Sequence, residues 1–376
     1  MSQNVVLAHD WLTGFRGGEW ILEAICQMFP EAPLYTLVYL PNRTSPIIEN
    51  RKIHTSALER IPNVHGIYRK LLPIFPLAVA QMKVSEPAEV MVSTSHCVIK
   101  GLKKPPGSFH LSYVHSPMRY MYDQYEAYFG PRSGSSSLQK FGAVISRPYL
   151  TAWDRWSNQN VDCMVANSDF VRDRIRRYYK RDPVVVYPFV EFSDFSPKHR
   201  APKSDFFLML TAFAPNKRVD LAIQAFNELK LPLKIIGEGQ EADRLKKMAG
   251  STIEFCGPLD RAQVVEHLAK ARALVFPGIE DFGITPLEAL ASGTPVIAIE
   301  KGGVLETLRS GDSVFFKEQT TRSLIEGVTT FMNRESKSDF QIPAHPASDP
   351  RSRLGLYTRE RFQKEINGLI EQRIRC

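Results

Sequence analysis

The sequence predicts an α/β protein of two domains, each built on a doubly wound parallel sheet. In the second half, short apolar runs alternate with amphipathic segments of about ten residues, the order expected of strands and helices in such a sheet. The first half repeats this alternation less regularly. With 376 residues, the chain is long enough for two domains. Ligands of such sheets bind beyond the carboxyl ends of the strands, so the loops there are the candidate sites.

The expected elements follow in chain order. In the first half, strands are predicted at 4–10, 34–40, 90–95, 109–116, 163–168 and 183–189, with helices at 19–29 and 171–179. In the second half, strands are predicted at 206–213, 233–239, 252–257, 273–278 and 294–300, with helices at 219–229, 241–249, 262–271 and from Thr285 onward.

Segments without periodicity mark the connections. The polar segment 191–205 carries proline and charge, and predicts a boundary between domains 1–190 and 191–354. The Gly- and Ser-rich segment 130–139 predicts a mobile loop, and a last helix is expected within 355–376.

The net charge of +8 is concentrated in the first half of the chain. Residues 1–190 hold 22 Lys and Arg against 15 Asp and Glu, whereas residues 191–376 hold 26 against 25. This asymmetry indicates either an anionic partner, such as a membrane surface or a phosphorylated lipid, or a merely solvated basic face. Nucleic acid is not expected, because no recognised binding module is present.

Two features bear on location. No apolar run reaches the roughly 20 residues of a membrane span, and the start lacks the pattern of a signal peptide, so we expect a cytoplasmic protein. Segment 60–82 mixes basic and bulky apolar residues with three prolines, and predicts either a surface lying on a bilayer or core helices. Five scattered cysteines argue against a disulfide framework and a zinc site.

Glu280 and Glu288 stand in EDFGITPLEALASGTPVIA with seven residues between them. Thr285, Pro286 and Glu288 have the spacing of a capping box, in which Glu288 would fold back onto the start of its own helix. The alternative is that both carboxylates contact one ligand.

Three other strand-to-helix turns could hold a phosphate. Gly17 and Gly18 in WLTGFRGGE would let free helix-terminal amides approach a ligand, although a simple glycine turn looks the same. Lys217 and Arg218 in PNKRVD place cations at a strand end, where they suit a pyrophosphate or form a solvated pair. The turn at Gly237 is a weaker signal of the same kind.

His115 follows an apolar strand in YVHSPMRYMYD, with Arg119 close by in the chain. A lone histidine is more often a packed core residue than a catalytic one. Its place at the ligand edge of the predicted sheet favours a functional role.

Together these motifs identify a family resemblance. GIEDFGITPLEALASGTPVIA, GGVLET, PNKRVD, GEGQEADRL, YVHSPMRY, VANSDFV and HDWLTGFRGGE resemble retaining GT-B glycosyltransferases of family 4 (glycosyltransferase group 1) over essentially the whole chain. The chain is most similar to bacterial mannosyltransferases that use GDP-mannose to build O-antigen and exopolysaccharide. The resemblance implies two Rossmann-like domains facing a central cleft, with helix 355–376 returning to the N-terminal one.

The resemblance also implies roles for residues. Glu280, His115 and Lys217 would be catalytic, with Glu280 under the donor sugar and Lys217 neutralising the leaving diphosphate. Further donor contacts would come from Gly17, Gly18, Arg218, Gly237, Phe282, Gly283, Ile284 and Glu288. Asp10 and Arg119 would contact the acceptor or support the site. The expected acceptor is a polyprenyl-diphosphate-linked oligosaccharide at the inner face of the cytoplasmic membrane, and no metal or other cofactor is expected.

One departure from the family pattern concerns the phosphate clamp. Members usually carry an arginine where this chain has Ala212, so Arg218 would have to supply that charge. Alternatives to a GDP-mannose enzyme are a UDP-sugar-dependent transferase and a non-catalytic protein that binds sugar nucleotides. A dehydrogenase would need GxGxxG after the first strand, and WLTGFRGGE does not match it.

Overall fold

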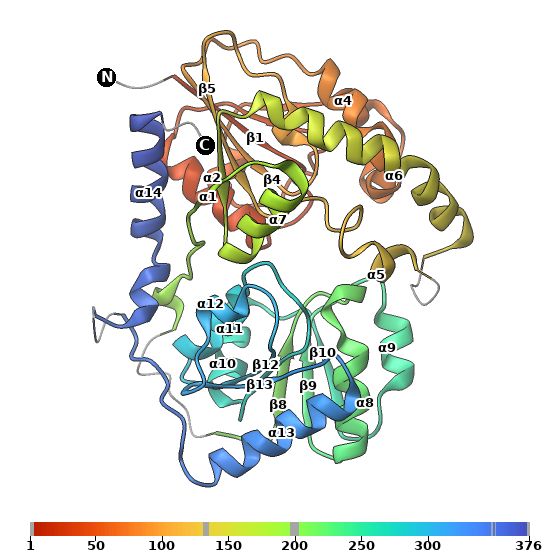
Figure 1. Ribbon diagram of the computed structural model, residues 1–376, viewed down its shortest axis with the longest axis vertical. Coiled ribbons are helices and arrows are strands. Elements are labelled where there is room, and N and C mark those ends of the chain that lie inside the picture. The colour runs from red at the N-terminus through yellow and green to blue at the C-terminus, as the bar shows by residue number, and fades with distance from the viewer. Residues whose placement is uncertain (1–3, 131–134, 196–202, 347–348, 350, 374–376) are drawn as a thin grey trace. The chain divides into compact units, whose positions relative to one another are not determined.

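The computed structural model describes residues 4–130, 135–195, 203–346, 349 and 351–373 (Figure 1). Its contacts divide the chain into two compact units, Met1–Pro188 with Arg359–Cys376, and Phe189–Thr358. The predicted divisions, after residues 190 and 354, lie within a few residues of these. Both units are α/β, with parallel strands throughout their named sheets, which confirms the predicted fold class.

The N-terminal unit is built on a seven-stranded sheet in the order β3-β2-β1-β4-β5-β6-β7. Its strands are β1 (Val5–His9), β2 (Leu34–Thr36), β3 (Ile53–Thr55), β4 (Val90–Ser95), β5 (Phe109–Val114), β6 (Cys163–Ala166) and β7 (Val184–Val185). The central strands β1, β4, β5 and β6 are buried along their whole length, as expected of a parallel sheet covered on both faces.

Helices connect and cover this sheet. They are α1 (Gly17–Met28), α2 (Pro46–Glu49), α3 (Val64–Ile67), α4 (Phe75–Gln81), α5 (Tyr125–Phe129), α6 (Ser137–Ser157), α7 (Asp169–Tyr179) and α14 (Arg359–Gln372). Short 3₁₀ turns are η1 (Ala57–Arg60), η2 (Tyr68–Ile74), η3 (Ile99–Gly101) and η4 (Asn158–Asn160). The last helix, α14, packs beside α1, where Gln363 Nε2 donates to Ala24 O at 2.9 Å (Figure 1).

The C-terminal unit is built on a six-stranded sheet in the order β10-β9-β8-β11-β12-β13. Its strands are β8 (Phe207–Leu210), β9 (Leu233–Ile236), β10 (Ile253–Gly257), β11 (Leu274–Phe276), β12 (Val296–Ile299) and β13 (Ser313–Phe316). Its helices are α8 (Val219–Leu229), α9 (Ala242–Met248), α10 (Arg261–Lys270), α11 (Ile284–Ala291), α12 (Val304–Thr307) and α13 (Thr321–Glu335), with 3₁₀ turns η5 (Phe192–Asp194), η7 (Pro215–Lys217) and η8 (Arg353–Tyr357).

Each sheet has one point at which the strand order reverses. In the N-terminal unit this point lies between β1 and β4, and in the C-terminal unit between β8 and β11. Loops leaving two such strands diverge to opposite sides and open a crevice where ligands of doubly wound folds bind. The loops after β1, β4, β8 and β11 are therefore the places to examine for function.

Some element predictions were wrong. The predicted loop 130–139 includes residues 131–134, which lie outside the described residues, but residues 137–139 already belong to α6. The final helix is shorter than 355–376, because η8 precedes it and α14 ends at Gln372. The predicted linker 191–205 begins with the 3₁₀ turn η5, whose first residue Phe192 and C-cap Phe195 are buried, while residues 196–202 lie outside the described part.

Segment 60–82 buries part of its apolar side chains in the core and exposes others. Tyr68, Phe75, Val79 and Met82 all belong to the buried cluster of the N-terminal unit, whereas Leu77 is exposed. Core helices therefore describe its buried residues, and the reading as a surface on a bilayer is not tested by this packing. Among the described helices, none combines the length and the apolar character needed to cross a membrane.

Candidate active site

The reversal point of the C-terminal sheet brings together two predicted residues, Lys217 and Glu280. Lys217 ends η7 after β8, and Glu280 lies in the loop after the neighbouring strand β11. The two side chains form an ion pair in which the Lys217 ammonium donates to Glu280 Oε1. The side chains are 24% and 13% exposed, respectively, so a ligand can still reach the pair. Strand order alone explains how residues 63 positions apart meet.

Two glycines allow these loops to approach so closely. A Cβ at Gly278 would lie 3.0 Å from both the Asn216 O and the Lys217 Cα, which places the β11 loop directly against η7. A Cβ at Gly303, after β12, would lie 2.5 Å from the Phe282 Cα. Gly303 N also donates to Glu280 O at 2.9 Å. The backbone around Glu280 is thus held from two sides, which fixes the position of its carboxylate.

Glu288 lies on α11 and pairs with a residue that the sequence did not point to. Arg261 Nη1 donates to Glu288 Oε1 at 2.6 Å, and Arg261 Nε donates to Asp194 Oδ2 at 2.8 Å. The Arg261 guanidinium also lies 4.8 Å from the Phe195 ring centroid. Glu288 is therefore held by a cation from the start of α10, as one arm of a three-residue charge cluster.

The predicted capping box at Thr285 is wrong. Helix α11 begins at Ile284, with Gly283 as its N-cap at φ 91°, ψ 71° and no side-chain cap. A Cβ at Gly283 would lie 3.0 Å from Val304 Cγ1, so packing against α12 favours glycine there. No side chain caps this helix start. That the amides of Gly283 and Ile284 contact a ligand stays a prediction. Phe282 is 3% exposed and packs against Tyr357, so it can offer a ligand little beyond its backbone.

Arg218 and Gly237 have local structural roles. Arg218 is the N-cap of α8 with φ 54°, and its Nε and Nη2 contact the Asp220 carboxylate at 3.1 and 3.3 Å. Its charge is thus paired within the start of α8 and does not join Lys217 at Glu280. Gly237, with φ 139°, would drive a Cβ into the Thr211 carbonyl, so glycine lets the loop after β9 pack against the loop after β8.

In the N-terminal unit, the reversal point carries a cluster of histidines. His9 ends β1, His96 follows β4 and His115 follows β5. The ring centroids of His9 and His96 are 6.3 Å apart, and those of His96 and His115 are 6.4 Å apart. His9 Nδ1 hydrogen-bonds Thr94 Oγ1 at 2.6 Å, and His9 Nε2 lies 3.8 Å from a carboxylate oxygen of Glu19 in α1.

His115 is held neutral in this cluster. Burial, reinforced by the neighbouring His96 and His9, lowers the pKa of His115 to about 3. Its Nε2 has no hydrogen-bond partner among the described residues. A Cβ at Gly18 would lie 3.6 Å from that nitrogen, so this glycine at the start of α1 sits against the His115 ring. A neutral imidazole with a free nitrogen can exchange a hydrogen bond with a hydroxyl without carrying charge.

Asp10 holds the backbone of the turn that carries His96. It is fully buried and accepts hydrogen bonds from the backbone N–H groups of residues 96–99 at 2.7–2.9 Å. Burial alone would raise the pKa of Asp10, but the His96 charge and these backbone groups outweigh it and hold the pKa below its usual value. An enclosed carboxylate of this kind positions its neighbours rather than meeting an acceptor. Burial lowers the pKa of His96, and the nearby positive charge of Arg119 lowers it further.

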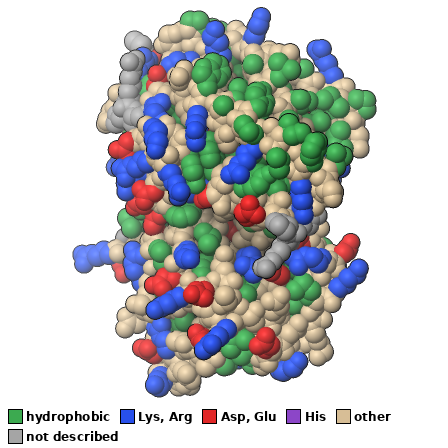
Figure 2. Space-filling view, turned by 45° about the vertical axis from the view of Figure 1, so that its right-hand side comes forward, with side chains coloured by type: hydrophobic (Ala, Val, Ile, Leu, Met, Phe, Trp, Pro, Cys, Tyr) green, Lys and Arg blue, Asp and Glu red, His purple; other side chains and the backbone are tan. Residues whose placement is uncertain are grey.

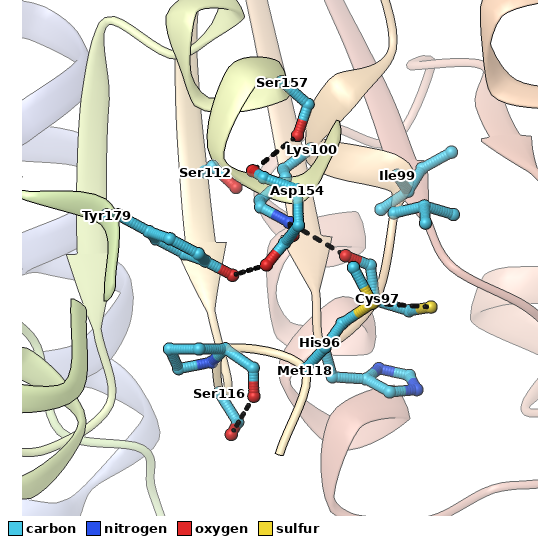
Figure 3. Close-up of polar contacts among 12 residues, drawn as sticks. His96, Cys97, Ile99, Lys100, Ser112, Ser116, Met118, Asp154, Ser157 and Tyr179 are labelled. Carbon is cyan, nitrogen blue, oxygen red and sulfur yellow. Dashed lines mark hydrogen bonds and ion pairs between the residues drawn. The ribbon is translucent and has the colours of Figure 1, made fainter. Parts of the chain in front are cut away.

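The turn that carries His96 is anchored by a buried ion pair (Figure 3). The Lys100 ammonium donates to the Cys97 carbonyl oxygen at 2.9 Å and pairs with Asp154 of α6. Tyr122 and Tyr179 donate their hydroxyls to the other Asp154 oxygen at 2.9 and 2.8 Å. Lys100 and Asp154 are 1% and 0% exposed, so this network fixes the backbone behind the histidines.

Sequence reasoning missed Arg261, His9, His96 and Glu19. For the histidines a signal existed, because both AHD and SHC follow apolar runs that end at the ligand edge of the sheet. Arg261 gave no such signal, since β10 lies at the sheet's edge, away from the reversal point.

Comparison with known proteins shows a family similarity within the C-terminal unit. Residues 191–344 match the family described as Glycosyl transferases group 1. An uncharacterized glycosyltransferase of Methanocaldococcus jannaschii is 25% identical over 208 residues, covering 54% of this chain and 57% of that protein. The human alpha-1,3/1,6-mannosyltransferase ALG2 is 24% identical over 238 residues, covering 53% and 57%. A GDP-mannose-dependent alpha-(1-6)-phosphatidylinositol dimannoside mannosyltransferase of Mycobacterium tuberculosis is 28% identical over 195 residues, covering 47% and 51%. The chain thus spans about half the length of the curated relatives it matches.

Solved structures resemble the whole chain in fold. Sucrose-phosphate synthase from Thermosynechococcus elongatus has a TM-score of 0.71 at 16% identity, covering 98% of this chain and 99% of the other. HepE from Anabaena, in complex with UDP and glucose, has a TM-score of 0.66 at 13% identity with the same coverage. At such identities the likeness concerns the fold alone. The chain therefore has the GT-B fold of two Rossmann-like domains, and residues 191–344 of its C-terminal domain are similar to the glycosyl transferases group 1 family.

Proposed function

We propose that this protein is a retaining glycosyltransferase that moves a hexose from a nucleotide sugar to a glycan acceptor. The observation that carries the proposal is the Lys217–Glu280 pair at the reversal point of a group 1 domain. A cation and a carboxylate side by side match a donor that carries a diphosphate next to a sugar. Lys217 would face the diphosphate, Glu280 the sugar hydroxyls and Glu288 the ribose.

The reaction breaks the bond between the anomeric carbon and the phosphate oxygen. The sugar becomes oxocarbenium-like, and a nucleoside diphosphate departs with the bonding electrons. Lys217 and the open amides at the start of α11 would stabilise that negative charge without a metal. The acceptor hydroxyl attacks the same face of the sugar and passes its proton to the departing phosphate, so the anomeric configuration is retained and no protein nucleophile is needed.

The N-terminal unit would contribute to the donor and to the acceptor. We propose that the free Nε2 of His115 bonds the donor sugar, with Gly17 and Gly18 beside the diphosphate and Arg119 near the acceptor. Supporting this is the arrangement around His115, whose lowered pKa keeps the imidazole neutral while glycine keeps its nitrogen uncovered.

GDP-mannose is the donor we favour. The support is that two relatives are mannosyltransferases by name, and that one of these is named as GDP-mannose-dependent. UDP-sugar is the second candidate, because HepE of the same fold was solved with UDP and glucose. The acceptor we favour is a polyprenyl-diphosphate-linked oligosaccharide used for surface polysaccharide. A peripheral position at the inner face of the cytoplasmic membrane would give access to it, and the basic excess of residues 1–190 supports that position.

Donor class is tested with a thermal-shift panel of GDP-mannose, GDP, UDP-glucose and UDP. We expect stabilisation by the guanine compounds alone, followed by transfer of labelled mannose to a polyprenyl-diphosphate-linked glycan. NMR should show an α-linked product, and EDTA should not reduce the rate. A thermal shift with UDP compounds alone would identify a UDP-sugar as the donor. A β-linked product or inactivation by EDTA would contradict the mechanism. Binding without any transfer would identify a non-catalytic protein.

Lys217→Met tests the assigned chemistry. Removing one preorganised donor to the leaving group should lower kcat by roughly a hundredfold. Lys247→Met, at an exposed position on α9, is the matched control and should retain full activity. An unchanged kcat in Lys217→Met would show that the diphosphate departs elsewhere.

A further inference from the structure

Helix α6 of the N-terminal unit presents its apolar side chains outward. Leu138, Phe141, Ile145, Tyr149 and Trp156 recur at intervals of three, four or seven residues and so share one face of the helix. They are 80%, 65%, 63%, 50% and 59% exposed, respectively. Val144 beside them is 61% exposed. We call these six side chains the α6 face.

The inward side of the same helix is more polar than the outward one. Its buried residues are Ala143, Ser146, Leu150, Asp154 and Ser157. Asp154 joins α6 to the N-terminal unit through its ion pair with Lys100 (Figure 3). A helix that only covers a globular core has the reverse pattern, with its apolar stripe inward. The exposed stripe on α6 therefore needs a contact outside this unit to explain it.

Exposed apolar residues elsewhere in the described chain do not gather in this way. The large apolar side chains that are strongly exposed number eleven, and six of them form the α6 face. Scattered exposed apolar residues are normal, whereas a contiguous patch marks an interaction surface. Figure 2 shows hydrophobic side chains gathered on the N-terminal unit, with lysine and arginine side chains nearby.

Most of the charges around the α6 face are basic. Within 137–157 the basic residues are Lys140, Arg147 and Arg155, and Asp154 is the single acid, fully buried against Lys100. The turn η2 packs against α6 and adds exposed Arg69 and Lys70, whereas α5, which also packs against α6, adds the exposed acid Glu126. The surface is therefore apolar with a mainly basic border.

We propose that the α6 face docks onto an anionic lipid bilayer. Leu, Phe and Ile side chains would enter the boundary between headgroups and acyl chains, and Tyr149 and Trp156 suit the interface itself. The basic border would meet the negative surface potential. A second copy of this chain fits less well, because a symmetric dimer would place one basic border against another. The inference does not rest on the proposed reaction, since docking needs neither donor nor acceptor.

Vesicle sedimentation of the full chain tests the proposal without any substrate. At low salt we expect binding to equimolar phosphatidylcholine and phosphatidylglycerol at least about tenfold tighter than to phosphatidylcholine alone. Added salt should weaken this preference. Arg69→Gln with Lys70→Gln should lower binding to the anionic vesicles by about tenfold.

The decisive variant is Phe141→Ser with Ile145→Ser. Both side chains are exposed, so the fold and melting temperature should not change, while vesicle binding should fall by at least about tenfold. The matched control is Ile47→Ser with Leu356→Ser, which removes two exposed apolar side chains outside the α6 face and should bind as the unaltered protein does. Equal binding by the two double variants would overturn the proposal.

Trp156 reports the contact directly. Lipids with brominated acyl chains should quench part of the tryptophan fluorescence, and this quenching should be absent in Trp156→Phe. If the protein binds vesicles but Trp156 is not quenched, the contact lies elsewhere and the proposal is contradicted. Absence of binding to anionic vesicles at low salt would also overturn it and leave a protein as the occupant. Light scattering tests whether a second copy binds the α6 face. A dimer of the unaltered protein that becomes a monomer in Phe141→Ser with Ile145→Ser would assign the α6 face to a second copy and contradict the proposal.

Discussion

At the scale of single residues, Glu288 shows how a familiar local pattern can mislead. The spacing from Thr285 to Glu288 is that of a capping box, yet the helix begins at Ile284 and Glu288 pairs with Arg261. The reason is tertiary packing, because Gly283 lies against Val304 and is the N-cap, two residues earlier than the Thr285 cap that the pattern predicts. The carboxylate is therefore not used up by its own helix.

Glu288→Gln should weaken donor binding. A carboxylate can accept from two ribose hydroxyls, whereas the amide offers one acceptor and would also leave Arg261 with Asp194 as its remaining carboxylate partner. Hydrogen bonds to a charged group contribute about 1.5–3 kcal/mol, so we expect the Kd of the nucleotide sugar to rise roughly tenfold to a hundredfold. Isothermal titration calorimetry measures this. Glu326→Gln, in an exposed pair on α13, is the control, and equal affinity in the two variants would remove Glu288 from the donor site.

The residues predicted best were those near the strand reversals. Lys217 and Glu280 follow adjacent strands, so the predicted alternation of elements was enough to place them together. Arg261 could not be placed, because its meeting with Glu288 depends on how α10 packs against α11. That contact involves side chains on two helices and has no regular spacing in the sequence.

At the scale of elements, α6 is a long helix that the sequence analysis did not predict. Gly142 and Pro148 interrupt its pattern, and Pro148 lies inside the helix. Its periodic apolar residues point outward, so they do not identify a core-facing stripe. What holds α6 to the unit includes the Lys100–Asp154 pair with two tyrosine hydroxyls, a contact that only the folded chain reveals.

Breaking that pair should destabilise the N-terminal unit. Asp154→Asn leaves Lys100 buried without its counter-ion, which costs about 3–5 kcal/mol. For a unit of this size the melting temperature should fall by about 10 °C in scanning calorimetry. Asp173→Asn, in an exposed pair on α7, should melt within about 2 °C of the unaltered protein. Lys100→Met with Asp154→Leu should recover much of the loss, and a melting temperature for Asp154→Asn equal to that of Asp173→Asn would contradict the role assigned to the pair.

At the scale of the whole molecule, both units repeat one design. Each is a parallel sheet with one order reversal, and the charged or polar side chains of interest follow the strands on either side of it. The fold class and most strand positions followed from alternating apolar runs. The edge strands β3 and β13 were not predicted, because strands of three and four residues show little alternation. Helix α13 was also not predicted, although its buried residues Leu324, Gly327, Val328 and Phe331 recur at helical spacing.

Stability should depend on pH through the buried histidines of the N-terminal unit. Burial lowers the pKa of His110 to about 4 and that of His115 to about 3, against a usual value of 6.5. Between pH 6.5 and 4 the unfolded chain therefore takes up protons that the folded chain does not, so stability falls as pH falls. From pH 7 to pH 5 we expect the free energy of unfolding in urea to drop by roughly 2 kcal/mol for His110 alone. His110→Gln should show a smaller drop, and an unchanged slope would contradict this account.

The ion pair of Lys217 and Glu280 has a consequence for selectivity. Without ligand, Lys217 and Glu280 neutralise each other. A donor that binds must therefore replace this ion pair with its own contacts to the two side chains. A nucleotide without its sugar would bind Lys217 but leave the largely enclosed Glu280 without a partner. A free sugar carries no charge with which to replace Glu280 as the partner of Lys217. Under the proposed function, the intact donor alone has partners for both side chains, so the site should bind the intact donor more tightly than the spent nucleotide.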